Sequence, residues 1–393
     1  MDNPFVYDRE LLAGELVDRT AEVAEVRAAL LQGKKHFLVG PRRYGKTSIL
    51  NAGAHAARRG TRGGVVLQYN VETFPRLTDL AGRIVADTAR FLRGRVDKVA
   101  GKLKRLFSSV RPRITYDPGE GVFTVGFDLA PRAEAVPLFV DVLHGLERAA
   151  VRERRRIGLI LDEFQLVVAP GGVAAEHQVR GAVQSHRRVG YVFAGSDTRM
   201  LEAMTRDPGR PFYRLGTVRF LEEIPRRDFD AHLRRGFRRL QAVVTTESRT
   251  AILDEADDVP YNVQLLAHAC WEALRAEGAG AELTPEGVRG IHEAEAGKLN
   301  PVFSGLWAGL TEAQKVALQA VRHEQGRGLF TQATAERYRQ PASTMQAALD
   351  GLVQKGICRR AVRGGEHEAL VRLEDPLFGA WLRARIPAPS PST

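Results

Sequence analysis

The chain has 393 residues, of which 44% are hydrophobic and 27% are charged, a composition typical of globular proteins with two or three domains. Its net charge of +11 suits nucleic acid, acidic proteins and anionic lipid equally, so charge alone does not choose a partner. No apolar run approaches the roughly 18 residues of a membrane span, and Cys270 and Cys358 are far apart, so we expect a cytoplasmic protein with no membrane partner, disulfide or cysteine metal site.

The first predicted elements lead into a phosphate-binding loop. A helix is expected over 20–31 and a strand over 35–40. The pattern G-x-x-x-x-G-K-T follows, in which glycines let backbone N–H groups surround phosphates and the next helix adds its positive dipole end. This loop predicts a site for ATP or GTP whose contacts are Gly40, Pro41, Arg42, Arg43, Tyr44, Gly45, Lys46, Thr47 and Ser48. Lys46 is expected to reach the β- and γ-phosphates as a catalytic group, and Thr47 to bind Mg²⁺.

A strongly basic segment follows the next strand, which is predicted over 64–70. From Leu92 to Val110 apolar residues recur with helical spacing, while the other face carries arginines and lysines. A β-hairpin is predicted over 114–125, which makes an insertion at about 92–127. The basic face is typical of the solvated side of an amphipathic helix; contact with nucleic-acid phosphates or with a membrane surface are the alternatives.

The strand over 157–162 ends in an acidic pair, as the second motif of a P-loop site requires. Asp162 is expected in the Mg²⁺ shell, and Glu163 is expected to orient and polarise the attacking water. Because the guanine-reading motif Asn-Lys-x-Asp does not occur, ATP is favoured over GTP.

Two further strands, over 190–195 and 216–221, complete a predicted α/β fold with a parallel sheet covered by helices. The first of them ends at Ser196, which is predicted to sense the γ-phosphate; the alternative is a turn or helix N-cap serine. Arg210 and Arg214 lie where an arginine that reaches a neighbouring subunit could be.

Beyond this predicted ATPase core, 1–222, the chain divides into two smaller units and a tail. Residues 223–300 are predicted to form an all-α lid with breaks at 259–260 and 278–280, and a basic cluster lies at 234–239. Residues 301–385 have the element order of a winged helix-turn-helix, which serves either DNA binding or protein docking. The predicted wing carries Arg359, Arg360 and Arg363, and the Pro- and Ser-rich tail, 386–393, is expected to be disordered.

Several motifs together resemble one known family. They are the segments 3–6 (Asn-Pro-Phe-Val), 16–22, 40–47, 161–165 and 193–196. They are similar to those of archaeal-type ATPases of the STAND branch of the AAA+ superfamily, and the likeness extends to about residue 385. It implies a P-loop core, a helical lid and a C-terminal winged helix, with Arg19 and Pro260 contacting the nucleotide. The chain has Asp18 and Asp258 where that family has glycine.

The sequence therefore predicts an AAA+/STAND ATPase that hydrolyses ATP slowly with Mg²⁺ and repositions its winged helix as a molecular switch. The alternative is a DNA-binding loader or a regulator of the transposition or replication type, in which ATP drives assembly on duplex DNA through the basic surfaces. A protein partner or self-association is also expected. A scaffold with a purely structural ATP is disfavoured by the intact Lys46, Thr47, Asp162 and Glu163.

Overall fold

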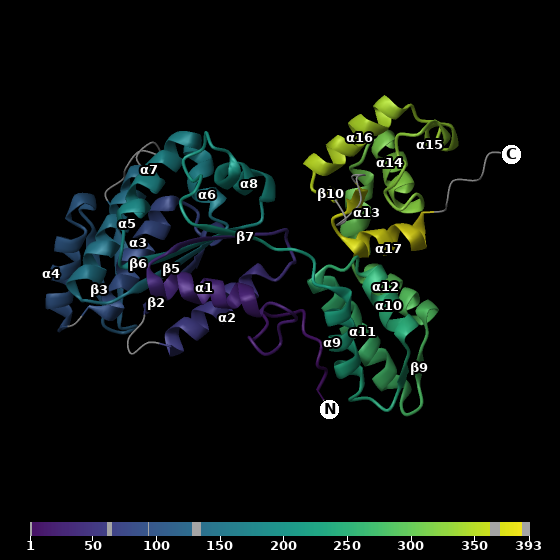
Figure 1. Ribbon diagram of the computed structural model, residues 1–393, viewed down its shortest axis with the longest axis horizontal. Coiled ribbons are helices and arrows are strands. Elements are labelled where there is room, and N and C mark those ends of the chain that lie inside the picture. The colour runs from purple at the N-terminus through teal and green to yellow at the C-terminus, as the bar shows by residue number, and fades with distance from the viewer. Residues whose placement is uncertain (1, 61–64, 93, 128–134, 362–369, 387–393) are drawn as a thin grey trace. The chain divides into compact units, whose positions relative to one another are not determined.

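The structure is a computed structural model that describes residues 2–60, 65–92, 94–127, 135–361 and 370–386. The chain divides into two compact units (Figure 1). One is Arg9–Glu223, and the other joins Met1–Asp8 to Ile224–Thr393. The first residues of the chain therefore belong with the C-terminal half and not with the core that follows them.

The unit Arg9–Glu223 is built on a five-stranded sheet with the strand order β2-β5-β6-β1-β7. The strands are β1 (Lys35–Val39), β2 (Val65–Asn70), β5 (Ile157–Asp162), β6 (Val189–Gly195) and β7 (Thr217–Phe220). Each lies within one residue of its predicted bounds, and the pairings are parallel. Because helices cover both faces, β5 and β6 are buried along their whole length, and the predicted α/β class is confirmed.

The helices of this unit pack on the two faces of the sheet (Figure 1). They are α1 (Thr20–Gln32), α2 (Lys46–Arg59), α3 (Leu77–Thr88), α5 (Ala135–Arg152), α6 (Gln165–Val168), α7 (Gly172–Ser185) and α8 (Thr198–Arg206). On the α1 face, Gly190 of β6 must be glycine because a Cβ there would collide with the backbone of Ala29 and Leu30. The backbones of α1 and the sheet therefore approach closely.

The helix predicted from Leu92 to Val110 is shorter than expected. The structure has α4 (Val96–Leu106), and Leu92 is extended. Gly94 has a φ of +137°, which is not a helical conformation, so the helix begins only after it. Val96 is therefore exposed, although the face behind it buries Val99, Leu103 and Leu106.

The predicted hairpin is confirmed as the antiparallel pair β3 (Arg113–Asp117) and β4 (Val122–Gly126). Exposed basic side chains line the outer face of α4 and its N-terminal flank: Arg95, Lys98, Lys104 and Arg105. Arg93 lies outside the described residues.

The second unit begins with four helices: α9 (Arg226–Phe237), α10 (Thr246–Glu255), α11 (Pro260–Glu277) and α12 (Pro285–Lys298). The prediction of helix throughout is wrong in one place, because β8 (Val243–Val244) pairs in parallel with β9 (Glu282–Leu283). The N-terminal segment packs on these helices: Phe5 contacts the rings of Phe237 and His232 and fills the space above Gly236.

The C-terminal part of this unit has a core of its own. Its elements are α13 (Asn300–Ala308), α14 (Glu312–His323), α15 (Gln332–Arg337), α16 (Ala342–Gln354), β10 (Cys358–Ala361), β11 (Leu370–Leu373) and α17 (Pro376–Arg385). β10 and β11 form an antiparallel pair; Arg363 of the predicted wing lies outside the described residues, as does the predicted tail from 387. Cys270 and Cys358 are buried and free, as expected. Within the described ranges, no helix is both long and apolar enough to cross a membrane.

A buried histidine links α7 to the sheet. His186 Nδ1 lies 2.7 Å from the Tyr191 hydroxyl, and its Nε2 lies 3.0 Å from Nδ1 of His144. Burial lowers the pKa of His186 to about 4, although the carboxylate of Glu147 acts in the opposite direction. His186 is therefore neutral in the folded protein at pH 7.

We expect this histidine to make the α/β unit acid-sensitive. Between about pH 6.5 and 4 the unfolded chain protonates His186 and the folded chain does not, so its contribution to stability is present above pH 6.5 and is lost on acidification, by about 2 kcal/mol at pH 5. His186→Asn keeps a polar partner for Tyr191 but has no imidazole to protonate. The free energy of unfolding of this variant should therefore fall much less between pH 7.5 and pH 5. Urea unfolding of both proteins near pH 7.5 and pH 5 measures it, and an unchanged pH dependence in the variant would contradict the assignment.

Candidate functional site

The P-loop joins β1 to α2, and its two glycines are needed for different reasons. Gly45 precedes α2 with a φ of +81°, a conformation that glycine adopts without strain. Gly40 must lack a side chain because a Cβ there would lie 2.8 Å from Cβ of Leu221. The loop also holds Arg43 at a φ of +69°. The predicted loop is therefore a defined backbone turn in direct contact with the end of β7.

The first residue of α2 turns its side chain back toward the loop. The Lys46 ammonium donates hydrogen bonds of 2.8 Å to the carbonyl oxygens of both Gly40 and Pro41. The side chain is buried, and this burial lowers the pKa of Lys46, while the carboxylates of Glu163 and Asp162 oppose the shift. The ammonium is thus held where the loop begins, in reach of any phosphate that the loop binds.

The two predicted Mg²⁺ ligands are neighbours. Thr47 Oγ1 donates a 3.1 Å hydrogen bond to Oδ2 of Asp162, although the residues are 115 positions apart. Burial, followed by repulsion from Glu163, raises the pKa of Asp162. Asp162 forms no ion pair with any residue that the structure describes.

This donor set fits magnesium bound together with a nucleotide. Nowhere in the described ranges do three or more His, Cys, Asp or Glu side chains gather as a cation cage. Mg²⁺ commonly takes one or two protein oxygens and completes its shell with phosphate oxygens and water. A hydroxyl and a buried carboxylate without an ion pair are oxygen donors of this kind.

Glu163, next in the chain, is held in a strained conformation. Its φ is +54°, which is uncommon for a residue with a side chain. One oxygen, Oε2, accepts three hydrogen bonds: from Gln165 Nε2 at 2.5 Å, from Ser196 N at 3.1 Å and from Ser196 Oγ at 2.8 Å. Burial alone would raise the pKa of Glu163, but these bonds and Lys46 outweigh it and leave the pKa below its usual value. The other oxygen, Oε1, has no hydrogen-bond partner among the described residues.

Ser196 is therefore joined to Glu163 and does not cap a helix. The N-cap of α8 is Asp197, whose carboxylate accepts the backbone N–H of Met200 at 2.9 Å. The N-cap alternative for Ser196 is wrong.

Gln165 is a site residue that the sequence analysis did not single out. Its amide is buried over Gly195, where a Cβ would collide with Gln165 Oε1. The available signal was its position two residues after Glu163, together with a glycine at the end of the neighbouring strand.

The remaining predicted contacts are placed as follows. Arg19 is buried and donates to the carbonyl of Glu222 at 2.9 Å, next to the Leu221 that packs under Gly40. The Ser48 hydroxyl already accepts the backbone N–H of Leu11 at 3.1 Å. Pro260 begins α11 in the other compact unit, so its contact with nucleotide stays a prediction.

The P-loop arginines and the two arginine-finger candidates differ in how they are held. Arg42 and Arg43 are exposed. Arg210, by contrast, forms a two-point ion pair with the fully buried Glu176, so it is committed within its own chain. Arg214 lies over the ring of Tyr213.

Comparison with known proteins finds likeness in structure but not in sequence. No family model matches the chain, and no curated protein matches it. A Walker-type ATPase of Pyrococcus abyssi is similar with a TM-score of 0.58 and 16% identity, over 97% of this chain and 99% of that chain. The ORC2 protein of Aeropyrum pernix, in ADPNP-ADP complexes, gives 0.56 and 16%, over 97% and 98%. The ORC1 protein of the same organism, in complex with DNA, gives 0.50 and 14%, over 97% and 95%. At such identities the likeness shows the fold alone, which is a P-loop α/β fold with a parallel sheet, followed by a helical C-terminal region.

The contact between Gln165 and Gly195 predicts a stability effect. Gly195→Ala should destabilise the protein by about 1–3 kcal/mol, because a methyl group has no room beneath the glutamine amide. Gly181→Ala is the matched control, since a Cβ on that exposed position of α7 meets nothing within 4 Å. It should be neutral or stabilise by up to about 1 kcal/mol. Urea unfolding of both variants decides, and equal stabilities would contradict the packing described.

Proposed function

We propose that this chain is an AAA+ ATPase of the STAND type, which binds ATP with Mg²⁺ at the P-loop and hydrolyses it slowly. The observation that carries the proposal is the 3.1 Å hydrogen bond between Thr47 and Asp162, which joins the two motifs of a P-loop site across the sheet edge. Lys46 and Glu163, which adjoin Thr47 and Asp162 in the sequence, supply the positive charge and the carboxylate that phosphoryl transfer to water requires.

Each residue has a distinct part in this proposal. The backbone of 40–45 and the Lys46 ammonium would hold the phosphates, and Thr47 and Asp162 would hold Mg²⁺. The bound ion would neutralise charge on the phosphate oxygens. Glu163 can orient a water molecule through its Oε1, because Ser196 and Gln165 already occupy and fix its Oε2. The same hydrogen bonds help to hold the pKa of Glu163 below its usual value, and a carboxylate with a lowered pKa is a weaker proton acceptor, which supports slow turnover.

The proposed output is a change in the placement of a winged helix. The order α14, α15, α16, β10, β11 supports this assignment, since a winged helix-turn-helix has helices followed by an antiparallel strand pair. Two of its strand arginines are engaged: Arg359 pairs with Asp257 at 2.7 Å, and Arg360 pairs with Asp350. Their availability to a partner would therefore depend on these ion pairs opening.

Two substitutions test the nucleotide site. Lys46→Ala should weaken ATP binding at least roughly tenfold, because a charge-assisted contact to phosphate is removed. Glu163→Gln should keep ATP affinity but lower turnover at least roughly 100-fold, because the amide cannot accept a proton from water. Lys34→Ala, at an exposed lysine before β1, is the control. Calorimetry and phosphate release measure both effects. Unchanged ATP affinity in Lys46→Ala would overturn the site, and normal turnover in Glu163→Gln would remove Glu163 from its role.

DNA binding is the second candidate function, and one surface favours it. Four exposed arginines on and just after α9 form no ion pair with any described residue: Arg234, Arg235, Arg238 and Arg239. Exposed arginines without carboxylate partners can neutralise backbone phosphates. The similar ORC1 protein of Aeropyrum pernix was solved in complex with DNA, so a fold of this kind is compatible with DNA as a partner.

A salt titration of labelled duplex, with ATP and with ADP, tests this candidate. If the α9 arginines contact phosphates, log affinity should fall with log salt by about 0.9 per contact, and replacing all four by Gln should make the slope shallower by roughly 3 to 4. The same replacement on α4, at Lys98, Lys104 and Arg105, identifies which surface is used. ATP affinity should be unchanged in both variants. No binding near ~50 mM salt in either nucleotide state would reject DNA as the ligand.

A further inference from the structure

The second unit contains a cavity of about 530 Å³ that the nucleotide site does not use. It lies among α10, α12, α14, β11 and α17, and its volume is in the range of small-molecule pockets. Its lining is rich in charge, with Arg289, Arg322 and Arg383 among the arginines and Asp254, Glu255 and Asp257 as the carboxylates.

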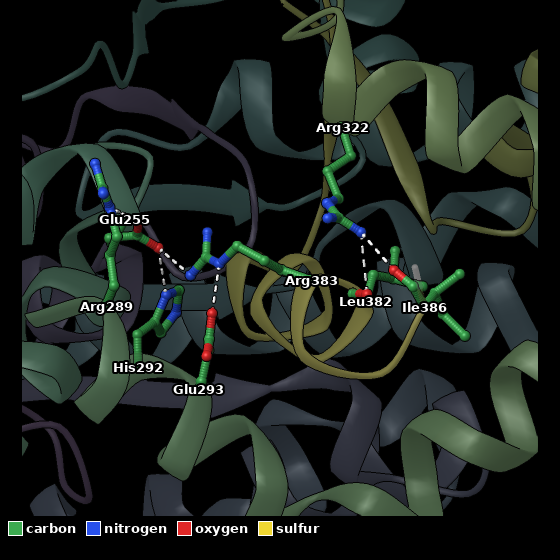
Figure 2. Close-up of polar contacts among 8 residues, drawn as sticks. All are labelled: Glu255, Arg289, His292, Glu293, Arg322, Leu382, Arg383 and Ile386. Atoms are coloured by element: carbon green, nitrogen blue, oxygen red, sulfur yellow. Dashed lines mark hydrogen bonds and ion pairs between the residues drawn. The ribbon is translucent and has the colours of Figure 1, made fainter. Parts of the chain in front are cut away.

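The carboxylates of the lining already form ion pairs or hydrogen bonds with basic side chains of the chain itself. Glu255 accepts from His292 at 2.9 Å and from Arg383 at 2.8 Å, and Arg289 lies 3.5 Å away (Figure 2). Although burial would raise the pKa of Glu255, His292 and Arg383 lower it to about 2. Asp257 pairs with both Arg359 and Arg372, and Asp254 pairs with Arg226 at 2.7 Å.

Arg322 is different, because its two hydrogen-bond partners are backbone carbonyls. Its Nη1 donates to Leu382 at 3.0 Å and to Ile386 at 3.2 Å, at the end of α17 (Figure 2). No carboxylate of the described residues lies within ion-pair distance of it. Burial lowers the pKa of Arg322, the nearby charge of Arg383 adds to this effect, and the carboxylate of Glu293 opposes it from beyond ion-pair distance. A half-buried guanidinium is therefore anchored by backbone carbonyls and forms no direct ion pair with a described residue.

The anchoring leaves a specific edge of Arg322 available. Both protons of Nη1 are used by the two carbonyls, so Nε and Nη2 remain, and these two groups form the fork that binds a phosphate or carboxylate through two parallel bonds. Arg383 uses Nε for Glu293 and Nη2 for Glu255, which leaves its Nη1 without a partner among the described residues. Arg289 is 58% exposed and holds Glu255 only loosely, so it can turn toward a ligand.

We propose that this cavity binds a small polyphosphate anion, held through the Nε–Nη2 edge of Arg322 and by Arg383 and Arg289. Polyphosphate fits because three arginines from three helices line one cavity, and an anion of several charges can satisfy more than one of them. Such a ligand would connect α12 to α14 and α17, and so would fasten the C-terminal helices to the preceding helical layer. The site is independent of the P-loop, which lies in the other compact unit.

The test uses pyrophosphate as the probe, titrated by calorimetry into the full chain. Because the P-loop also binds phosphates, Lys46→Ala is used to separate the two sites. Pyrophosphate binding at the proposed site should persist in Lys46→Ala and should weaken at least roughly tenfold when Arg322→Gln is added, because a two-point charged contact is lost. Arg322→Lys, which keeps the charge but lacks the edge, should weaken binding nearly as much. In a chain that keeps Lys46, Arg322→Gln should leave the affinity for ATP at the P-loop unchanged.

Substitutions at two exposed arginines separate loss of binding from loss of folding. Arg289→Gln removes a cavity arginine that contributes little to packing, and it should weaken binding several-fold. Arg275→Gln on α11, at a similarly exposed arginine outside the cavity lining, is its control and should have no effect. Pyrophosphate should also raise the unfolding temperature of Lys46→Ala but not of the variant that carries Arg322→Gln as well.

Three outcomes would overturn the inference. If all pyrophosphate binding is lost in Lys46→Ala, only the P-loop binds, which leaves the proposed function intact. If citrate binds as tightly as pyrophosphate, the cavity binds multivalent anions in general and is not selective for phosphate. If duplex DNA binding depends on Arg322 while pyrophosphate binding does not, the arginines belong to a nucleic-acid surface.

Discussion

The parallel pairing of β5, β6 and β1 is the constraint on which the candidate site depends. In a parallel sheet the carboxyl ends of all strands lie at one edge, so the residues that follow each strand meet there. Val39 of β1 pairs with Gly195 of β6, and the next residues along the chain are Gly40 and Ser196. β5 ends at Asp162 beside them. A one-residue change of register would move these groups apart, so the burial that fixes the register also fixes the geometry of the site.

The site contains local strain and close contacts that the surrounding packing maintains. Glu163 keeps a positive φ because its carboxylate is bonded to Ser196 and Gln165, and Gln165 fits only because Gly195 has no side chain. These four residues therefore act together. The side chains of Gln165 and Ser196 hold Oε2 of Glu163, and this fixes the direction of its other oxygen, Oε1. Such an arrangement orients Glu163 at the cost of its conformational freedom, and the same hydrogen bonds contribute to the lowered pKa of this carboxylate.

Much of the fold could be predicted because its signals are local. The strands are continuous apolar runs and the P-loop is a contiguous motif, so both are visible without tertiary information. The predicted start of α4 at Leu92 was wrong because Gly94 adopts a positive φ, and a pattern of apolar residues carries no information about that backbone angle. Gln165 was missed because its role depends on a glycine from another strand. The assignment of residues 2–8 to the second unit depends on Phe5 filling a space above Gly236, a contact between segments far apart in sequence.

The chain passes between the two units twice, after Asp8 and after Glu223, and both passages are anchored on the core side near the P-loop. Leu11 donates its backbone N–H to Ser48 in the first turn of α2, and Glu10 accepts a hydrogen bond from Asn51 one turn later. The Glu222 carbonyl accepts Arg19, and the neighbouring Leu221 packs against Gly40. A change in the backbone of the loop would therefore act directly on both connections, since each is bonded to a residue at or beside it. On the core side, both connections between the units are therefore held by residues at or beside the P-loop.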